Sequence, residues 1–260
     1  MYFVIWTLWT RDIVRFYRQR SRVVGALGSP VVFWLLLGSG LGTSFRAGPE
    51  DLPLAGGYLE YFYPGTLALI VLFTAIFSTI SVIEDRETGF LQGVLVAPVP
   101  RGAIVLGKIL GGTTLALLQA MVFLLFAPLA NIQLTLSVLP TIGLILTILA
   151  FALTGLGFSI AWAMDSTQGF HAIMNLLLIP MWILSGAVFP AAGAAGWIKV
   201  IMLINPMTYG IAALRTVIPS TTIAMGSEPP LVFSVTVLLV FSAVVLVVGT
   251  ILVRRTGRTK

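Results

Sequence analysis

Four consecutive charged residues, Glu84-Asp85-Arg86-Glu87, interrupt a long hydrophobic part of the chain. A charged side chain at the centre of a bilayer costs roughly 3 kcal/mol, so we expect all four to lie in water between two membrane spans. An apolar stripe follows at helical spacing and consists of Phe90, Leu91, Val94 and Leu95. Ala97-Pro98 then ends this short amphipathic segment, residues 88–96. Such an element can transmit a push from another protein to two spans; the alternative is a surface loop that its acids keep in water.

Two other groups of residues could do chemistry, and neither has the required pattern. Residues 102–109 read G-x-x-x-x-G-K followed by Ile, whereas a phosphate-binding loop needs Ser or Thr at that position and a preceding strand. His171 is the only histidine, and its nearest acid, Asp165, lies on a different helical face. Cysteine is absent, which removes thiol catalysis and thiolate zinc sites. We therefore predict no catalytic residue and no metal site in this chain.

The composition is that of an integral membrane protein. Hydrophobic residues make up 58% of the 260 residues and charged residues only 9%, against about 25% in soluble domains. The net charge of +6 does not indicate nucleic acid, because the bases cluster beside hydrophobic stretches, at residues 11–22 and 254–260. That placement is typical of anchors to membrane lipid.

A spanning helix needs roughly 20 apolar residues. The sequence therefore predicts an all-α integral membrane fold with six spans, at residues 23–45, 61–83, 109–130, 139–164, 172–189 and 231–253. We place a tight turn at 131–137, because no charge separates the third span from the fourth. Asp165 is expected to cap the turn before the fifth span. These ranges contain no ionisable side chain, which argues against an ion-coupled carrier.

The distribution of bases predicts the orientation of the six spans. If the N-terminus is inside, twelve Lys and Arg residues lie inside and three lie outside, namely Arg46, Lys199 and Arg215. Because basic loops stay in the cytosol, we expect both termini to be cytosolic in a multi-pass protein of the cytoplasmic membrane.

Residues 1–22 predict an amphipathic helix that lies in the membrane interface. Plotted at 100° per residue, arginines and aromatic residues fall on opposite faces. One face holds Arg11, Arg15, Arg18 and Arg22, and the other holds Trp6, Trp9 and Phe16. We expect the rings among lipid headgroups and the arginines toward phosphates and cytosol. Residues 23–260 then form one six-span domain.

The longest outer connection, residues 190–230, is not simply polar. Residues 197–204 are almost continuously apolar but too few to span a bilayer. Such runs lie at the interface or re-enter the membrane, so we expect interfacial or re-entrant outer helices between the fifth and sixth spans.

Two segments resemble the type-2 permease family of ATP-binding-cassette (ABC) exporters. Residues 84–101, E-D-R-E-T-G-F-L-Q-G-V-L-V-A-P-V-P-R, with L-G-K at 106–108, resemble the family's loop E-x-E-x-G-T-L-x-x-L-x-x-x-P-V-x-R…L-G-K. Residues 180–190, P-M-W-I-L-S-G-A-V-F-P, with N-P-M-T-Y-G-I-A-A-L-R at 205–215, resemble its signature P-x-x-x-L-S-G-x-x-F-P…N-P-x-x-Y-x-x-x-x-L-R. The chain departs from the pattern at Phe90, where Thr is frequent, and at Gln92, where an acid is frequent. The L-S-G-x-x-F-P form is closer to the drug and lipo-oligosaccharide export branch.

The resemblance implies three groups of site residues. Coupling to an ATPase falls to Glu84, Asp85, Arg86, Glu87, Gly89, Leu91, Leu95, Pro98 and Arg101. The N-terminal helix, with the interfacial residues named above, braces this segment. An outer gate is formed by Pro180, Ser185, Gly186, Phe189, Pro190, Asn205, Pro206, Tyr209 and Arg215. Aromatic candidates for a substrate pathway are Phe73, Phe77, Phe123, Phe126, Trp162 and Trp182.

As a function, the resemblance implies the permease subunit of an ATP-driven exporter that moves an amphipathic or lipid-linked substrate outward by alternating access. The chain would not be an enzyme itself, since two partner ABC ATPase subunits bind ATP and Mg. A second permease copy, in a homodimer or heterodimer, would complete the complex. One alternative is a permease for polysaccharide, O-antigen or teichoic-type glycans. Another, of a different class, is a membrane scaffold that anchors an ATPase without transport.

Overall fold

The computed structural model describes residues 2–41, 57–218 and 228–256, and the regular elements within these ranges are all helices. The α-helices are α1 (Tyr2–Arg18), α2 (Arg20–Leu41), α3 (Gly57–Glu87), α4 (Phe90–Val96), α5 (Arg101–Phe123), α6 (Leu139–Ala163), α7 (Thr167–Trp182), α8 (Gly196–Ile204), α9 (Pro206–Val217) and α10 (Leu231–Thr256). Shorter helical turns are Leu124–Ala130, Ile183–Ala187 and Ala191–Gly193.

Six of the described helices are long and apolar enough to cross a membrane: α2, α3, α5, α6, α7 with the turn that follows it, and α10. They confirm the predicted all-α membrane fold and its six spans. The turn predicted at 131–137 is also present, between the 3-10 turn Leu124–Ala130 and α6. Residues 42–45 of the first predicted span, and Arg46, lie outside the described residues.

Two helices are longer than their predicted spans. α3 takes in Glu60 and Glu84–Glu87, and α5 begins at Arg101, so that it includes Lys108. Glu60, Asp85 and Lys108 are all buried. The prediction that the spans lack ionisable side chains therefore holds within the narrower predicted ranges but is wrong for the helices that contain them.

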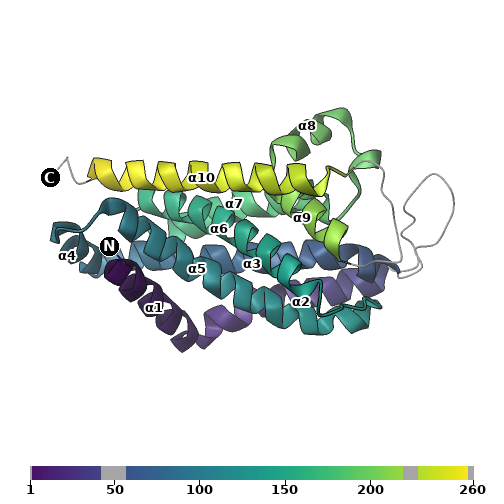
Figure 1. Ribbon diagram of the computed structural model, residues 1–260, viewed down its shortest axis with the longest axis horizontal. Coiled ribbons are helices and arrows are strands. Elements are labelled where there is room, and N and C mark those ends of the chain that lie inside the picture. Colours follow the sequence, from purple (N-terminus) through teal and green to yellow (C-terminus); the bar gives the residue numbers. More distant parts are fainter. Residues whose placement is uncertain (1, 42–56, 219–227, 257–260) are drawn as a thin grey trace.

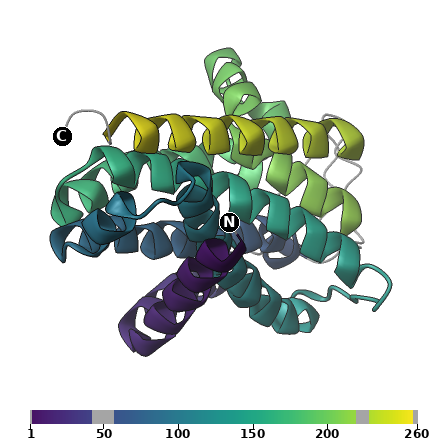
Figure 2. The same ribbon diagram turned by 60° about the vertical axis from the view of Figure 1, so that its left-hand side comes forward.

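Helix α3 is the centre of the bundle, with α2, α5 and α6 packed along it (Figures 1 and 2). Every side chain from Tyr58 to Leu72 except Leu59 is buried. Burying apolar area stabilises the fold by about 25 cal/mol per Å² in water, whereas in a bilayer close packing takes over that role. A helix so enclosed can transmit movement at one of its ends to its neighbours.

The two ends of the bundle differ in their elements. The start of α1, helix α4 and the end of α10 lie at one end, on the left of Figure 1, which we call the charged end. Helices α8 and α9 lie toward the other, the far end, and α8 projects from the bundle (Figure 1). The axes of α8 and α9 differ by 84° across the break at Asn205, as a re-entrant or interfacial pair requires.

Helix α1 ends at Arg18, and Gln19 separates it from α2, so the predicted boundary at residue 22 is slightly late. α1 runs obliquely across the charged half of the bundle, drawn purple in Figure 2, and packs on α5. Gly107 and Gly111 permit this close approach. A Cβ at Gly107 would lie 3.2 Å from the Ile5 carbonyl oxygen, and one at Gly111 would lie 3.2 Å from Asp12 Cβ.

Candidate functional site

Helix α4 is the short amphipathic helix that the sequence predicts, but it begins at Phe90 rather than Thr88. Glu84–Glu87 belong to the last turn of α3, and a turn through Thr88 and Gly89 separates the two helices. Gly89 has φ +75°, a left-handed conformation that glycine adopts at little cost. α4 ends at Val96, where Ala97 takes an extended conformation before Pro98, as the sequence predicts.

The two faces of α4 have different surroundings. Leu91 is buried, and Phe90, Val94 and Leu95 are half-buried, so the apolar stripe faces the protein. The other face is exposed and carries Gln92, Gly93 and Val96. Val96 is 88% exposed, which leaves an apolar side chain in contact with whatever surrounds the charged end.

Asp85 is fully buried, so the prediction that all four charges lie in water is wrong for this residue. Its carboxylate accepts two hydrogen bonds from Arg11, at 2.6 and 2.7 Å, and one from Arg15 at 2.6 Å. Lys108 is the third partner of this carboxylate, and its Nζ donates a hydrogen bond of 2.5 Å to Asp85 Oδ2. A carboxylate can leave water when bases and hydrogen bonds replace its hydration, and here α1 and α5 supply three bases.

Asp12 extends this buried network to a second acid. Lys108 Nζ lies 2.9 Å from Asp12 Oδ1, so one ammonium group bridges Asp12 of α1 and Asp85 of α3. Burial raises the pKa of the Asp12 carboxyl above its ordinary value, although the nearby Lys108 opposes that rise. The hydrogen bond to Asp85 raises the pKa of Arg11, which keeps its guanidinium charged.

The arginine stripe of α1 faces the protein more than the lipid phosphates, which corrects the sequence expectation. Arg15 Nη2 lies 2.7 Å from Glu84 Oε2, and Arg22, which lies in α2, is also ion-paired with Glu84. Arg18 is exposed. The stripe differs from the prediction because acids at the end of α3 approach α1. A helical plot of residues 1–22 alone cannot show partners that come from another helix.

The aromatic face of α1 divides between lipid and protein. Trp6 is exposed, as an interfacial anchor requires. Trp9 donates a hydrogen bond of 2.9 Å from Nε1 to Thr114 of α5, and Phe16 is buried. The expectation that all three rings lie among headgroups is therefore wrong for Phe16 and incomplete for Trp9.

Arg86, at the end of α3, and Arg101, at the start of α5, hold the segments on either side of α4. Arg86 donates to the carbonyl oxygens of Trp162 and Met164, at 2.6 and 3.1 Å, and lies 2.9 Å from Asp165. Arg101 donates to the Leu95 carbonyl oxygen at 2.7 Å and so satisfies the carboxyl end of α4. Glu87 and Pro98 are exposed.

Asp165 does not cap α7, contrary to the prediction. The cap is Ser166, whose hydroxyl oxygen accepts a hydrogen bond from the Gly169 amide. Asp165 is ion-paired with Arg86 instead. A short polar turn offers several caps, and a base 79 positions away in the sequence decides between them.

Sequence reasoning missed the part played by Phe90, Lys108 and Asp12. The Arg11 guanidinium lies 3.7 Å from the centre of the Phe90 ring, so the residue that departs from the family pattern is a contact between α1 and α4. Lys108 and Asp12 form the buried network described above. A usable signal was present for Lys108 alone, since a base inside an apolar run needs an acidic partner.

At the far end, several of the predicted gate residues gather around the π-helical turn Ile183–Ala187. Gly186 has φ +84° and is buried. Its carbonyl oxygen accepts hydrogen bonds from Arg215 at 2.9 Å and from Tyr61 at 3.0 Å. The Arg215 guanidinium also lies 4.2 Å from the centre of the Tyr61 ring. Tyr61 therefore belongs to this group, although no motif of the sequence indicated it.

Asn205 joins the α8–α9 pair to the same turn, and Tyr209 joins α9 to α8. Asn205 Nδ2 donates to the carbonyl oxygens of Met181 and Leu184, at 2.5 and 3.3 Å, while its Oδ1 accepts from the Met207 amide and caps α9. Tyr209 donates to the Leu203 carbonyl oxygen at 2.6 Å. One amide side chain thus serves three backbone groups on three elements, namely α7, the π-helical turn and α9.

The remaining predicted gate residues act mainly through the backbone of the α7–α9 region. Ser185 is buried and donates to the Trp182 carbonyl oxygen, and Pro206 is the first residue of α9. Phe189 is half-buried, and Pro190 precedes the turn Ala191–Gly193. Pro180 is exposed inside α7, and its carbonyl oxygen accepts a hydrogen bond from the amide of Ile183, the first residue of the turn.

Six spans, a short helix anchored to the charged end and a bent pair of helices at the far end define a helical transport permease. Residues 4–218 match the ABC-2 type transporter family, and the chain belongs to that family. Permeases of this family pair with a separate ABC ATPase subunit, so ATP hydrolysis is not the work of the permease chain.

Relatives support this assignment over most of the chain. The chain is 27% identical over 218 residues to ycf38 of Cyanophora paradoxa, named as a transport permease, with 81% of this chain and 72% of the relative covered. It is 27% identical over 252 residues to nodulation protein J of Rhizobium leguminosarum bv. viciae, covering 95% and 93%. It is 25% identical over 211 residues to DrrC of Mycobacterium tuberculosis (strain CDC 1551 / Oshkosh), named as a doxorubicin resistance ABC transporter permease, covering 79% and 73%.

Proposed function

We propose that this chain is the permease subunit of an exporter that moves an amphipathic or lipid-linked substrate outward, driven by ATP that two partner ATPase subunits bind with Mg. The observation that carries the proposal is α4. It presents an exposed face with Val96 at its end, while Leu91, Arg11 and Arg101 hold its other side to the bundle.

Rigid attachment on one side and exposure on the other suit the transfer of movement from a partner. A force on α4 reaches α3 through the Gly89 turn, and α1 through the contact of Arg11 with Phe90. Exposed apolar side chains on an otherwise polar surface are typical of protein contacts. A wet surface loop, the alternative in the sequence, would not require the carboxyl end of α4 to be bonded by Arg101.

We assign the charged end to the cytosol. The basic residues of α1, and Arg254 and Arg255 at the end of α10, lie on the side of the bundle where α4 is found (Figure 1). This supports cytosolic termini under the positive-inside rule, and it puts α4 where an ATPase could reach it.

The substrate pathway lies between two permease copies in this proposal. α7 exposes Asn175 and His171 beside apolar residues, and an exposed amide in a spanning helix is costly against lipid alone. The His171 ring lies 6.2 Å from that of Phe77 on α3, and Phe77 lies 6.0 Å from Phe73. The exposed imidazole of His171 and the half-buried rings of Phe73 and Phe77 suit an amphipathic cargo. In contrast, Phe123, Trp162 and Trp182 are buried within one copy.

The experiment tests the ATPase surface. We would replace Val96 with Asp and measure binding of the cognate ATPase to the purified permease. As a matched control we would replace Leu136, 84% exposed in the turn before α6, with Asp. We expect Val96→Asp to weaken binding about tenfold or more, as truncation of a central contact does, and Leu136→Asp to leave it unchanged. Equal binding by both variants would refute α4 as the docking element.

A transport assay separates the exporter from a scaffold. With permease and ATPase in liposomes, an exporter shows ATP hydrolysis that its cargo stimulates, and Val96→Asp should abolish that stimulation. Hydrolysis that no amphipathic compound alters, together with unchanged ATPase docking, would favour the scaffold.

A further inference from the structure

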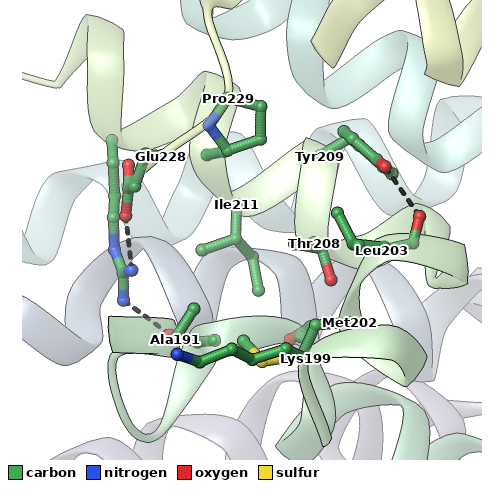
Figure 3. Close-up of a pocket in the computed structure, with 13 residues that line it drawn as sticks. Ala191, Lys199, Met202, Leu203, Thr208, Tyr209, Ile211, Glu228 and Pro229 are labelled. Atoms are coloured by element: carbon green, nitrogen blue, oxygen red, sulfur yellow. Dashed lines mark hydrogen bonds and ion pairs between the residues drawn. The ribbon is translucent and has the colours of Figure 1, made fainter. Parts of the chain in front are cut away.

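A cavity of about 530 Å³ lies between the π-helical turn Ile183–Ala187, α8 and α9 at the far end of the bundle (Figure 3). Its size is in the range of small-molecule sites. Met202 and Leu203 of α8, Ile211 of α9 and Pro229 give it largely apolar walls. This cavity is separate from the exposed face of α4 and belongs to one copy of the chain.

The charged residues that line the cavity are two bases and one acid. Arg215 Nη1 lies 2.8 Å from Glu228 Oε1, so these two charges compensate each other. Lys199 is exposed and forms no ion pair with any described residue. Figure 3 shows its side chain lying along the cavity beside Met202, with the nitrogen toward Ala191. Among the described residues, the lining therefore has one positive charge without an ion-pair partner, that of Lys199.

Two buried polar atoms of the lining residues have no hydrogen-bond partner in the described part of the chain. They are Nε of Arg215 and Oγ1 of Thr208. Buried polar atoms are rarely left unpaired in proteins, because an unmade hydrogen bond costs about 1–3 kcal/mol. A ligand with several oxygen acceptors could satisfy both atoms.

Helix α8 brings the cavity to the membrane interface. Its nine residues are too few to span a bilayer, yet Trp197, Leu203 and Ile204 are between 66% and 78% exposed. A short helix with exposed apolar residues and a lysine is typical of the headgroup region. Leu203 both faces outward and lines the cavity, so lipid and cavity are adjacent.

We propose that this cavity binds an anionic amphiphile, a molecule that joins a phosphate-like head to a hydrocarbon chain. The head lies at Lys199, where it accepts hydrogen bonds from Thr208 and Arg215. The chain lies against Met202, Leu203 and Ile211. The inference does not depend on the direction of transport or on its energy source.

The test measures ligand binding by native mass spectrometry, with the full chain purified in a maltoside detergent. The probes are lysophosphatidylglycerol, which has an anionic head and one chain, lysophosphatidylcholine, which is zwitterionic, and inorganic phosphate. The variants are Lys199→Gln, Thr208→Val and, as a control base at the other end of the bundle, Arg18→Gln.

We expect lysophosphatidylglycerol to bind more tightly than either other probe. Lys199→Gln should weaken it about fivefold, as loss of one interfacial base does. Thr208→Val should weaken it about tenfold, the effect of losing a hydrogen bond to a charged group. Thermal stability should not fall in Thr208→Val, since that buried hydroxyl has no partner among the described residues and its removal breaks no hydrogen bond. Arg18→Gln should bind as the unmodified chain does.

Three results would overturn the proposal. Equal binding of the anionic and zwitterionic lipids would show that the site does not select an anionic head. Binding of inorganic phosphate as tight as that of the lipid would show that the hydrocarbon chain contributes nothing to binding. Binding that neither Lys199→Gln nor Thr208→Val alters would place the lipid elsewhere on the protein.

Discussion

The guanidinium of Arg11 lies between the Asp85 carboxylate, at 2.6 Å, and the Phe90 ring, 3.7 Å from its centre. One side chain of α1 thus contacts the last turn of α3 and the first residue of α4. The two interactions of Arg11 differ in kind, since the one with Asp85 is a buried ion pair and the one with Phe90 is a cation–π contact. The first holds α1 to the bundle, and the second orients the short helix.

Replacing Phe90 with Leu should weaken the orientation of α4 while the fold remains intact. A cation–π contact at a partly exposed site contributes about 0.5–1 kcal/mol, which corresponds to a two- to fivefold loss. We expect a loss of this size in the affinity of the cognate ATPase, measured by biolayer interferometry. Phe3→Leu, at an 81% exposed position of α1, is the control and should have no effect. An unchanged affinity in Phe90→Leu would contradict the assigned role.

Gly89, just before α4, and Gly93, inside it, should respond to alanine in opposite directions. No atom would obstruct a Cβ at Gly89 or Gly93, so sterics do not separate them. Gly89→Ala forces a left-handed conformation that costs roughly 1 kcal/mol, whereas Gly93→Ala favours the helix by about that amount. Amide hydrogen exchange of α4 should therefore become faster in the first variant and slower in the second. A change in the same direction for both would show that the turn at Gly89 does not control α4.

Lys108→Met should be strongly destabilising, because it leaves two buried acids without their shared base. Removing one partner of a buried ion pair costs about 3–5 kcal/mol. We expect a large fall in the thermal unfolding temperature in detergent, and partial recovery when Asp12→Asn is added. Arg18→Met removes an exposed base that forms no ion pair with any described residue and is the control, with no expected loss. A Lys108→Met variant as stable as the control would mean that the network is not needed for folding.

Asn175→Leu should weaken association of two permease copies if α7 faces the second copy. Hydrogen bonds between membrane helices contribute about 0.6–2 kcal/mol, so the dissociation constant should rise about three- to thirtyfold. Energy transfer between labelled copies in liposomes, at several protein to lipid ratios, measures this. Thr236→Leu on α10 is the control, because that exposed hydroxyl already donates to the Val232 carbonyl oxygen. Equal effects of the two substitutions would exclude α7 as the contact.

The local features of the charged end could be predicted from the sequence because they depend on neighbouring residues. The apolar stripe of α4 and its stop at Ala97-Pro98 follow from spacing and from the geometry of proline. The burial of Asp85 could not be predicted from its neighbours, because its partners Arg11 and Lys108 lie 74 and 23 positions away. Four adjacent charges look alike in a sequence, yet one is buried and another, Glu87, is exposed.

The far end shows the same division. The resemblance picked out Asn205, Tyr209 and Arg215, and all three form hydrogen bonds within the α7–α9 region. Tyr61 could not be found in this way, because it lies in the first half of α3, where nearly every residue is buried and aromatic side chains look like packing alone. Only the folded chain brings its hydroxyl to Gly186, 125 positions away.

Arg86 determines how many helices respond when the end of α3 is displaced. It binds two carbonyl oxygens at the carboxyl end of α6 and the acid that precedes α7. A displacement of the end of α3 would therefore move the carboxyl end of α6 and the start of α7 together with it. Three helices would then transmit the movement to the far end as one unit and share the force that a partner applies.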